Sequence, residues 1–173
     1  IHGRGWLHRD LKPGNILVDM DRPGEGSTKL IDLGVASRLG DPPEELFIGT
    51  PEYCAPEMLA GYPFDERSDL YAFGLILYEV IEGRRPWPGS DEQDLLDARL
   101  GKPAPPLTHP DCPKALSQLV TLLLQPQPQK RPRTAAEVLE RFGHAVGRQT
   151  PLELPEAFAR RLHGVVFPRR EPV

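Results

Sequence analysis

Hydrophobic positions divide the chain into a short extended region near its start and a longer helical region after it. Two apolar runs, Ile16-Leu17-Val18 and Leu30-Ile31, flank a segment rich in Asp, Pro and Gly at residues 19–27. Runs of this length beside turn-forming residues predict two short strands joined by a polar loop. Chemically reactive side chains stand next to both runs, where loops on a rigid scaffold commonly carry function.

From Ser68 onward the hydrophobic spacing becomes helical. Apolar residues at positions 70–81 leave almost no polar face, which predicts a helix that is buried on all sides. Gly83 stands where such a helix would end. This longest apolar stretch contains Glu79 and falls short of the ~20 apolar residues that span a bilayer, so no membrane-spanning segment is expected.

Three more helices follow in the pattern. Residues 90–93 have the spacing of a capping box and open a helix that would end at Gly101. Apolar residues at helical spacing fill positions 116–124, before Pro126. A second capping-box pattern at residues 134–137 opens the last of these helices. The shared apolar face of this last helix consists of Val138, Leu139 and Phe142.

Composition divides the chain into a module at residues 1–147 and a Pro- and Arg-rich tail at residues 148–173. The tail has the composition of a disordered linker or terminus, which a short helix at residues 156–162 would interrupt. Four arginines near its end suggest a nucleic-acid or membrane binder, but the nearby prolines fit a solvated tail better. The sum predicts a mainly α (α+β) module with a short β-hairpin region near its start.

The bulk composition is that of an ordinary globular domain, with 39% hydrophobic and 27% charged residues in 173. A formal net charge of −4 argues against a nucleic-acid partner, which would need a basic surface. The two cysteines, Cys54 and Cys112, are too few for a disulfide framework or a zinc site. A reducing, cytoplasmic location is therefore expected, and nothing in the sequence indicates an oligomeric state.

Three side chains suited to phosphoryl transfer occur within residues 8–15, whose sequence is His-Arg-Asp-Leu-Lys-Pro-Gly-Asn. The carboxylate of Asp10 can accept the proton of an attacking hydroxyl, the ammonium of Lys12 can offset phosphoryl charge, and the amide of Asn15 can bind Mg²⁺. The apolar run that follows at once would hold so short a loop in place. Taken alone, an Asp and a Lys in a polar loop also fit a solvated turn.

This run resembles the catalytic loop of the protein kinases, H-R-D-L-x-x-x-N, at every specified position. Its Lys-Pro-x-Asn form is typical of the serine/threonine kinases. The resemblance implies that Asp10 is the catalytic base and that Lys12 and Asn15 belong to the site for ATP and Mg²⁺. It also places Leu17 beneath the adenine of ATP.

Asp32-Leu33-Gly34 follows the second apolar run and resembles the kinase D-F-G motif, with Leu in place of Phe. Such triplets are common, and this one gains weight from its place 17 residues after Asn15, at the end of a predicted strand. The resemblance implies that Asp32 binds Mg²⁺ and that Gly34 lets the backbone swing there. Leu33 would keep an apolar plug of lower bulk.

Residues 49–57 resemble the substrate platform of serine/threonine kinases, which ends in Ala-Pro-Glu. The resemblance implies that Thr50 hydrogen-bonds to the carboxylate and the ammonium of the catalytic loop and orients both. It also pairs Glu57 with Arg131 in a buried ion pair, and removing either partner of such a pair costs ~3–5 kcal/mol. The alternative is that Glu57 and Arg131 are separate surface charges.

Ser68-Asp69 opens the long apolar helix. An Asp at the start of a helix accepts backbone N–H groups. In kinases the corresponding Asp binds backbone amides of the catalytic loop, so the resemblance implies that Asp69 anchors the loop bearing His8 and Arg9. A plain helix cap is the simpler reading and is compatible with this role.

Arg9 also bears on regulation, because such kinases usually pair this Arg with a phosphorylated residue of the activation segment. Between Asp32 and Gly49 the only hydroxyl side chain is that of Ser37, which lies too early for this role. Our hypothesis is that Glu44-Glu45 partly substitutes for phosphate against Arg9. A solvated acidic loop is the alternative.

The resemblance implies that the parent protein transfers the γ-phosphoryl group of ATP, with Mg²⁺, to Ser or Thr hydroxyls of protein substrates. The sequence contains no G-x-G-x-x-G loop to cover the phosphates. We therefore expect the large lobe of a kinase domain, incomplete at its N-terminal side, with one side of the helix at 70–81 exposed and with no activity as an isolated chain. The alternative is a catalytically inactive kinase-like remnant or scaffold.

Overall fold

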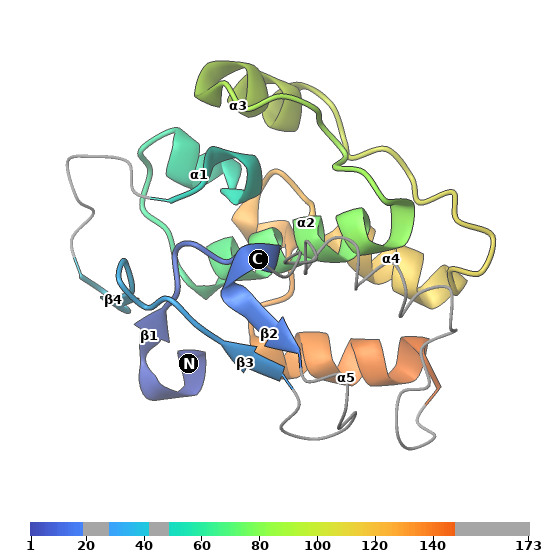
Figure 1. The fold of residues 1–173 in the computed structure, drawn as a ribbon, viewed down its shortest axis with the longest axis horizontal. Helices are drawn as coiled ribbons and strands as arrows, with labels where there is room; N and C mark the ends of the chain where they lie inside the picture. Colours follow the sequence, from blue (N-terminus) through green and yellow to red (C-terminus); the bar gives the residue numbers. More distant parts are fainter. Residues whose placement is uncertain (19–27, 42–48, 148–173) are drawn as a thin grey trace, which may run out of the picture.

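The computed structural model describes residues 1–18, 28–41 and 49–147. The hypothesis on Glu44-Glu45 and the predicted tail, with its helix at residues 156–162, lie outside these ranges. Figure 1 shows helices stacked beside a small β region, with the N-terminus next to the strands. The mainly helical character with a little sheet near the start is confirmed.

The bounds of the elements are as follows. The α-helices in the described ranges are α1 (Pro56–Leu59), α2 (Glu66–Glu82), α3 (Glu92–Gly101), α4 (Lys114–Leu123) and α5 (Ala135–Ala145). The strands there are β1 (Trp6–Leu7), β2 (Ile16–Val18), β3 (Thr28–Leu30) and β4 (Ser37–Arg38). The short 3₁₀ helices there are η1 (His2–Arg4), η2 (Pro13–Asn15), η3 (Pro51–Tyr53) and η4 (Pro128–Lys130).

The strands pair in two small antiparallel sheets, β1 with β4 and β2 with β3. Ile16 stands opposite Leu30 in the β2–β3 pair, so the predicted hairpin is confirmed. The predicted bounds of its second strand, Leu30-Ile31, are wrong, because the strand begins at Thr28 and ends at Leu30. All residues of β3 are exposed, so no alternation of apolar and polar positions marks the strand in the sequence.

Helix α2 begins at Glu66 and not at Ser68, which corrects the predicted start. Asp65 caps it, because its side chain accepts a hydrogen bond from the backbone N–H of Arg67 at 2.8 Å. The apolar positions start only a turn later, so hydrophobic spacing missed the first turn. The predicted end is confirmed: Gly83 closes the helix with a φ of 71°, in the left-handed region.

The predicted capping box of α3 is wrong in both partners, and that of α5 is wrong in one. Asp91, not Ser90, caps α3, and its carboxylate accepts the backbone N–H of Asp94 at 3.0 Å. At α5, Thr134 accepts the N–H of Glu137 at 3.2 Å as predicted, but the Glu137 carboxylate accepts the N–H of the residue before the cap at 2.8 Å. An ionised acceptor is favoured at the positive end of a helix, which is why Asp91 replaces the hydroxyl.

The hydrophobic core is centred on α2. Helix α4 packs against α2, and α5 packs against α4 (Figure 1). At the α2–α4 contact, a Cβ built on Gly74 would lie 2.7 Å from the Cβ of Leu123, so the approach requires glycine. The fully buried side chains of this core include Tyr71, Leu75, Tyr78, Ile81, Val120, Leu123 and Leu124.

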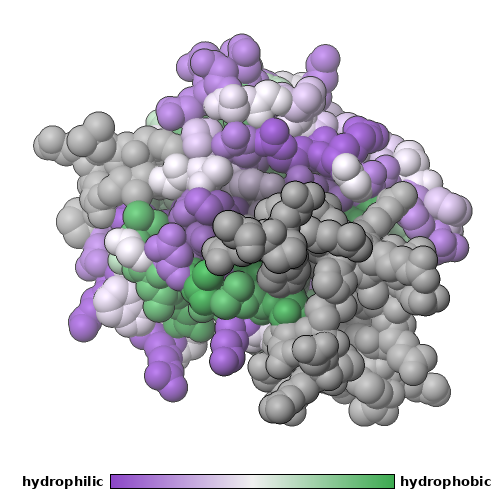
Figure 2. Space-filling view, in the orientation of Figure 1, coloured by the Kyte–Doolittle hydropathy of each residue, from purple (hydrophilic) through white to green (hydrophobic). Residues whose placement is uncertain are grey.

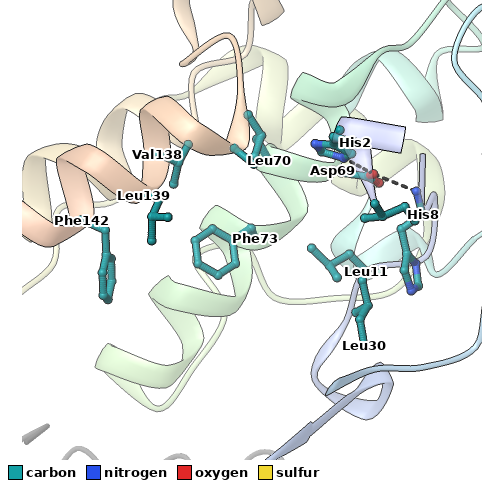
Figure 3. A pocket seen from close by; sticks show the side chains of 13 residues that line it. His2, His8, Leu11, Leu30, Asp69, Leu70, Phe73, Val138, Leu139 and Phe142 are labelled. Carbon is teal, nitrogen blue, oxygen red and sulfur yellow. Dashed lines mark hydrogen bonds and ion pairs between the residues drawn. The ribbon is translucent and has the colours of Figure 1, made fainter. Parts of the chain in front are cut away.

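The expectation of an exposed side of α2 is wrong, because the apolar residues at positions 70–81 are buried except Phe73, which is half-buried. An apolar groove of about 490 Å³ nevertheless lies between α2 and α5. Leu70 and Phe73 of α2 face Val138, Leu139 and Phe142 of α5 across it (Figure 3). Of the predicted apolar face of α5, Val138 is buried, Phe142 is half-buried and only Leu139 is exposed, at 72%. Figure 2 shows apolar side chains gathered on the viewed face of the molecule. In the part of the chain that the structure describes, no helix combines the length and apolar character that crossing a bilayer requires.

Candidate active site

The loop at residues 8–15 lies between β1 and β2 and carries the predicted catalytic residues. Its last residues form η2, which leads directly into β2. The side chains of His8, Arg9 and Asn15 are buried, although each is polar. Buried polar groups need hydrogen-bond partners, and the partners of this loop come from several elements.

Asp69 of α2 holds the start of the loop. Its two carboxylate oxygens accept the backbone N–H groups of His8 at 2.8 Å and of Arg9 at 2.9 Å. Arg9 has a φ of 69°, which is unfavourable for a residue with a side chain. The two charge-assisted hydrogen bonds stabilise this conformation and so determine where Asp10 lies. Because Asp65 caps α2, the carboxylate of Asp69 serves the loop instead.

Sequence patterns did not reveal His2. Its Nε2 lies 2.8 Å from Oδ2 of Asp69, the oxygen that also accepts the N–H of His8 (Figure 3). No motif marks His2, which stands in η1, and only the fold brings it to Asp69. His8 in turn contacts the β3 side of the site, since its Nε2 lies 3.1 Å from the carbonyl oxygen of Ile31.

Asp10, Lys12 and Thr50 form a closed triangle of polar contacts. The hydroxyl of Thr50 donates to Oδ1 of Asp10 at 2.6 Å. The ammonium of Lys12 donates to Oδ2 of Asp10 at 2.7 Å and to Oγ1 of Thr50 at 2.8 Å. Each of the three groups therefore orients the other two, and the carboxylate is positioned before any substrate arrives.

Asp10 is ionised at neutral pH. Burial by itself would raise the pKa of this carboxyl group, but hydrogen bonds from Lys12 and Thr50 and the charge of Lys12 outweigh it and lower the pKa below its ordinary value. A third hydrogen bond, from Asn15, acts in the same direction. An ionised carboxylate in this position can accept or orient the proton of a hydroxyl.

Asn15 and Asp32, the predicted Mg²⁺ ligands, lie on neighbouring backbone segments. The amide nitrogen of Asn15 donates to the backbone oxygen of Asp10 at 2.8 Å and to its Oδ2 at 3.2 Å, which leaves Oδ1 of Asn15 to bind a metal. The backbone N–H of Ile31 donates to the carbonyl of Asn15 at 2.9 Å, and Asp32 follows at once. Asn15 and Asp32 therefore lie at the same end of the β2–β3 hairpin, the end opposite its connecting loop.

Asp32 stands in an exposed turn. Its φ is 62°, and its Oδ1 accepts the backbone N–H of Gly34 at 3.3 Å. A Cβ on Gly34 would lie 3.2 Å from that oxygen, so glycine suits this tight turn. The prediction that Leu33 forms an apolar plug is wrong, because Leu33 is 58% exposed and is not packed into the described core.

The donor atoms fit Mg²⁺ bound together with nucleotide phosphates. A carboxylate and an amide oxygen are hard ligands, and Mg²⁺ commonly takes only one or two protein carboxylates beside phosphates and water. Within residues 1–18, 28–41 and 49–147, no group of three or more His, Cys, Asp or Glu side chains is placed to hold a metal ion. A metal there would therefore share its ligands between Asn15, Asp32 and the nucleotide. Leu17, predicted beneath adenine, is 43% exposed on β2.

Glu57 and Arg131 are joined in a buried ion pair. The two terminal nitrogens of Arg131 donate to the two carboxylate oxygens of Glu57 at 2.7 and 2.8 Å, and the side chains are 0% and 7% exposed. Ser68 adds a hydrogen bond to Glu57 at 2.7 Å. Arg131 also donates to the carbonyls of Gln125 and Pro126. The alternative of two separate surface charges is therefore wrong.

The cysteines do not add a nucleophile to the site. Cys54 and Cys112 are both free. Burial raises the pKa of Cys54 to about 12, so its thiol stays protonated at neutral pH and is a poor nucleophile.

Sequence comparison adds the family. The sequence model of the protein kinase domain matches residues 1–142, which include every site residue described above. The chain belongs to the protein kinase domain family. The match includes both the loop at residues 8–15 and the triplet Asp32-Leu33-Gly34.

Named serine/threonine kinases are among the similar proteins. The chain is 36% identical to serine/threonine-protein kinase pkn2 of Myxococcus xanthus over 156 residues, covering 84% of this chain and 19% of that protein. It is 32% identical to serine/threonine-protein kinase PknA of Mycobacterium tuberculosis over 154 residues, covering 87% and 35%. It is 35% identical to DNA damage-responsive serine/threonine-protein kinase RqkA of Deinococcus radiodurans over 143 residues, covering 79% and 21%. The chain thus spans about a fifth to a third of the length of these relatives.

Proposed function

We propose that the protein carrying this chain is a protein serine/threonine kinase. Residues 1–147 form the large lobe of its kinase domain, and residues 148–173 are a tail outside that lobe. The observation that carries the proposal is the triangle of Asp10, Lys12 and Thr50, in which an ionised carboxylate is oriented beside a cation.

The proposed reaction is a direct phosphoryl transfer from ATP to a Ser or Thr hydroxyl of a protein substrate. The hydroxyl oxygen forms a bond to the γ-phosphorus, the bond from that phosphorus to the bridging oxygen breaks, and ADP leaves. Asp10 accepts the hydroxyl proton, Lys12 offsets charge on the phosphoryl group, and Thr50 orients both. A positioned general base contributes about 10²–10⁴-fold to such a step.

Asn15 and Asp32 would hold Mg²⁺, whose charge neutralises the phosphates when it is bound. Leu17 would lie beneath the adenine. His8, Arg9, Gly34, Asp69 and the pair of Glu57 and Arg131 act by positioning rather than by touching the reacting atoms. A cytoplasmic location, where ATP is available and both cysteines stay reduced, is part of this proposal.

The isolated chain is expected to bind ATP feebly and to transfer no measurable phosphate. Its sequence contains no G-x-G-x-x-G loop that could cover the phosphates. The function must therefore be tested on the full-length protein.

The test is phosphate transfer from labelled ATP to a generic basic protein by the full-length protein. We expect Mg²⁺-dependent phosphoserine or phosphothreonine, lost in the Asp10→Asn variant. The matched control is Asp111→Asn, an exposed Asp remote in sequence from the site. Folded full-length protein with no Asp10-dependent transfer would support the inactive scaffold instead.

A further inference from the structure

Arg99 of α3 is the largest fully buried side chain in the described part of the chain, at 1% exposure. Its acceptors are backbone carbonyls of one short segment. One terminal nitrogen donates to the carbonyls of Pro51, at 3.0 Å, and of Cys54, and the other donates to the carbonyl of Glu52 at 2.7 Å. Trp87 lies beside it, with the ring centre 6.0 Å from the guanidinium carbon.

A buried guanidinium held by carbonyls alone is unusual for a domain core. Burial lowers the pKa of Arg99, and burying a charge is unfavourable unless it is paired or fully hydrogen-bonded. Among the residues that the structure describes, no carboxylate lies within ion-pair distance of Arg99. The three carbonyl oxygens therefore stabilise the charge, and the charge in turn holds those carbonyls in place.

The segment that Arg99 holds continues directly from the active-site triangle. Thr50, which donates to Asp10, is followed by η3. The turn is closed by hydrogen bonds from the N–H of Tyr53 to the carbonyl of Thr50 at 2.9 Å and from the N–H of Cys54 to that of Pro51 at 3.3 Å. Arg99 thus fixes the end of a turn whose beginning orients the catalytic carboxylate.

We propose that Arg99 is a positioning residue for the protein substrate, and this inference rests on the proposed kinase function. It fixes residues 50–54, the platform on which a substrate segment would lie, relative to Asp10. The residues proposed to lie beneath the adenine and to hold Mg²⁺, Leu17, Asn15 and Asp32, stand in or beside the β2–β3 hairpin, which the side-chain contacts of Arg99 do not include. Lys12, proposed to offset phosphoryl charge, contacts Thr50 of the platform but also has its own contact with Asp10. Loss of Arg99 therefore impairs use of the protein substrate and leaves ATP binding intact.

The kinetic test compares Arg99→Met and Arg99→Lys in the full-length protein. We expect the KM for a peptide substrate to rise about tenfold in Arg99→Met, which removes the hydrogen bonds to all three platform carbonyls. Arg99→Lys keeps the charge but cannot reach three carbonyls, so its rise is smaller. The KM for ATP, and the slow hydrolysis of ATP without peptide, stay within about twofold of wild type.

The matched control is Arg141→Met, which removes an arginine that is half exposed and pairs with Glu137 on the surface of α5. It leaves both KM values unchanged. A purely structural role for Arg99 would change the two KM values together, or neither, and would overturn the proposal. If Arg99→Met does not fold, the KM values of Arg99→Lys test the proposal in its place. If Arg99→Lys does not fold either, the proposal is overturned.

Hydrogen exchange separates this inference from the proposed function. In Arg99→Met the amides of Tyr53 and Cys54 are expected to exchange about tenfold faster, while those of α4 do not change. Exchange that is unchanged, or that rises equally throughout the domain, would contradict the anchoring role of Arg99. A wild-type protein without phosphate transfer would defeat the proposed function, and the exchange result would still decide whether Arg99 anchors the segment.

Discussion

Asp10 and Asp32 belong to one site but have different surroundings. The side chain of Asp10 is 12% exposed and accepts hydrogen bonds from Lys12, Thr50 and Asn15. Asp32 is exposed, and in the described ranges its carboxylate accepts a hydrogen bond only from Gly34 in its own turn. The protein therefore orients by itself the carboxylate proposed to accept the proton, whereas the carboxylate proposed to bind Mg²⁺ would depend on groups that a nucleotide supplies.

The backbone repeats this contrast. Arg9, before the first carboxylate, has a positive φ that Asp69 stabilises from a buried helix. Asp32 itself has a positive φ, and its contact with Gly34 is local. A conformation held by a distant buried group is harder to change than one held within an exposed turn. The Asp32 turn is thus the part of the site suited to rearrange.

Replacing Asp10 by Asn should have the largest effect. An amide cannot accept the hydroxyl proton, so kcat of the full-length protein is expected to fall by about 10²–10⁴-fold. The measurement is peptide phosphorylation, with the melting temperature showing that the variant folds. Asp111→Asn is the control. If Asp10→Asn had nearly the same kcat as Asp111→Asn, Asp10 would not be the proton acceptor.

Breaking the buried ion pair should have the next largest effect. Glu57→Ala leaves the guanidinium of Arg131 buried without its carboxylate, and we expect a loss of ~3–5 kcal/mol in the free energy of unfolding. Urea denaturation measures this loss. Glu140→Ala is the control, because Glu140 is 71% exposed and lies 4.0 Å from the ring nitrogen of His144. Equal losses in both variants would show that the platform beside Asp10 does not depend on the pair.

Asp32→Asn should act on the metal and not on the fold. The Mg²⁺ concentration for half-maximal activity is expected to rise at least about tenfold, as when other metal-site groups are lost. The free energy of unfolding without ATP should stay within ~0.5 kcal/mol, because the side chain is exposed. Asp41→Asn is the matched control, an exposed Asp that accepts a backbone N–H, from Arg38 at 2.8 Å. If the Mg²⁺ concentration for half-maximal activity did not change, Asp32 would not be a metal ligand.

The pH dependence of stability should show the smallest effect. The pKa of Asp10 is lowered in the folded protein, so its stabilising contribution is present above the unfolded pKa of about 3.9 and is lost as pH falls through the folded pKa. The difference in unfolding free energy between wild type and Asp10→Asn should be constant from about pH 5 to 8 and shrink below about pH 4. Urea titrations at a series of pH values measure it. A difference that varies between pH 5 and 8 would show that Asp10 titrates there.

Helix positions were predictable, but several of their ends were not. The long apolar run predicts the position of α2 correctly but not its cap at Asp65 or its first residue, Glu66, because polar residues carry no hydrophobic period. Ser90 was chosen over Asp91 for the same reason: neighbouring polar residues compete for one capping role, and only the backbone geometry decides between them. Strand β3 was misplaced because it buries no side chain.

The sequence by itself determined the chemistry of the catalytic loop. Asp10, Lys12 and Asn15 are neighbours along the chain. Strand β2 begins directly after Asn15, so all three lie near one end of the hairpin.

Only the tertiary structure decided which distant groups support that loop. Arg99 and the carbonyl of Glu52 are 47 residues apart, and nothing in the sequence distinguishes this buried arginine from one on a solvated helix face. The contact of His2 with Asp69 is likewise not visible in the sequence. Leu33 is the reverse case, an apolar residue that is exposed although the sequence predicts that it is packed. The physical reason is that burial depends on how whole helices pack, and a single residue type does not carry that information.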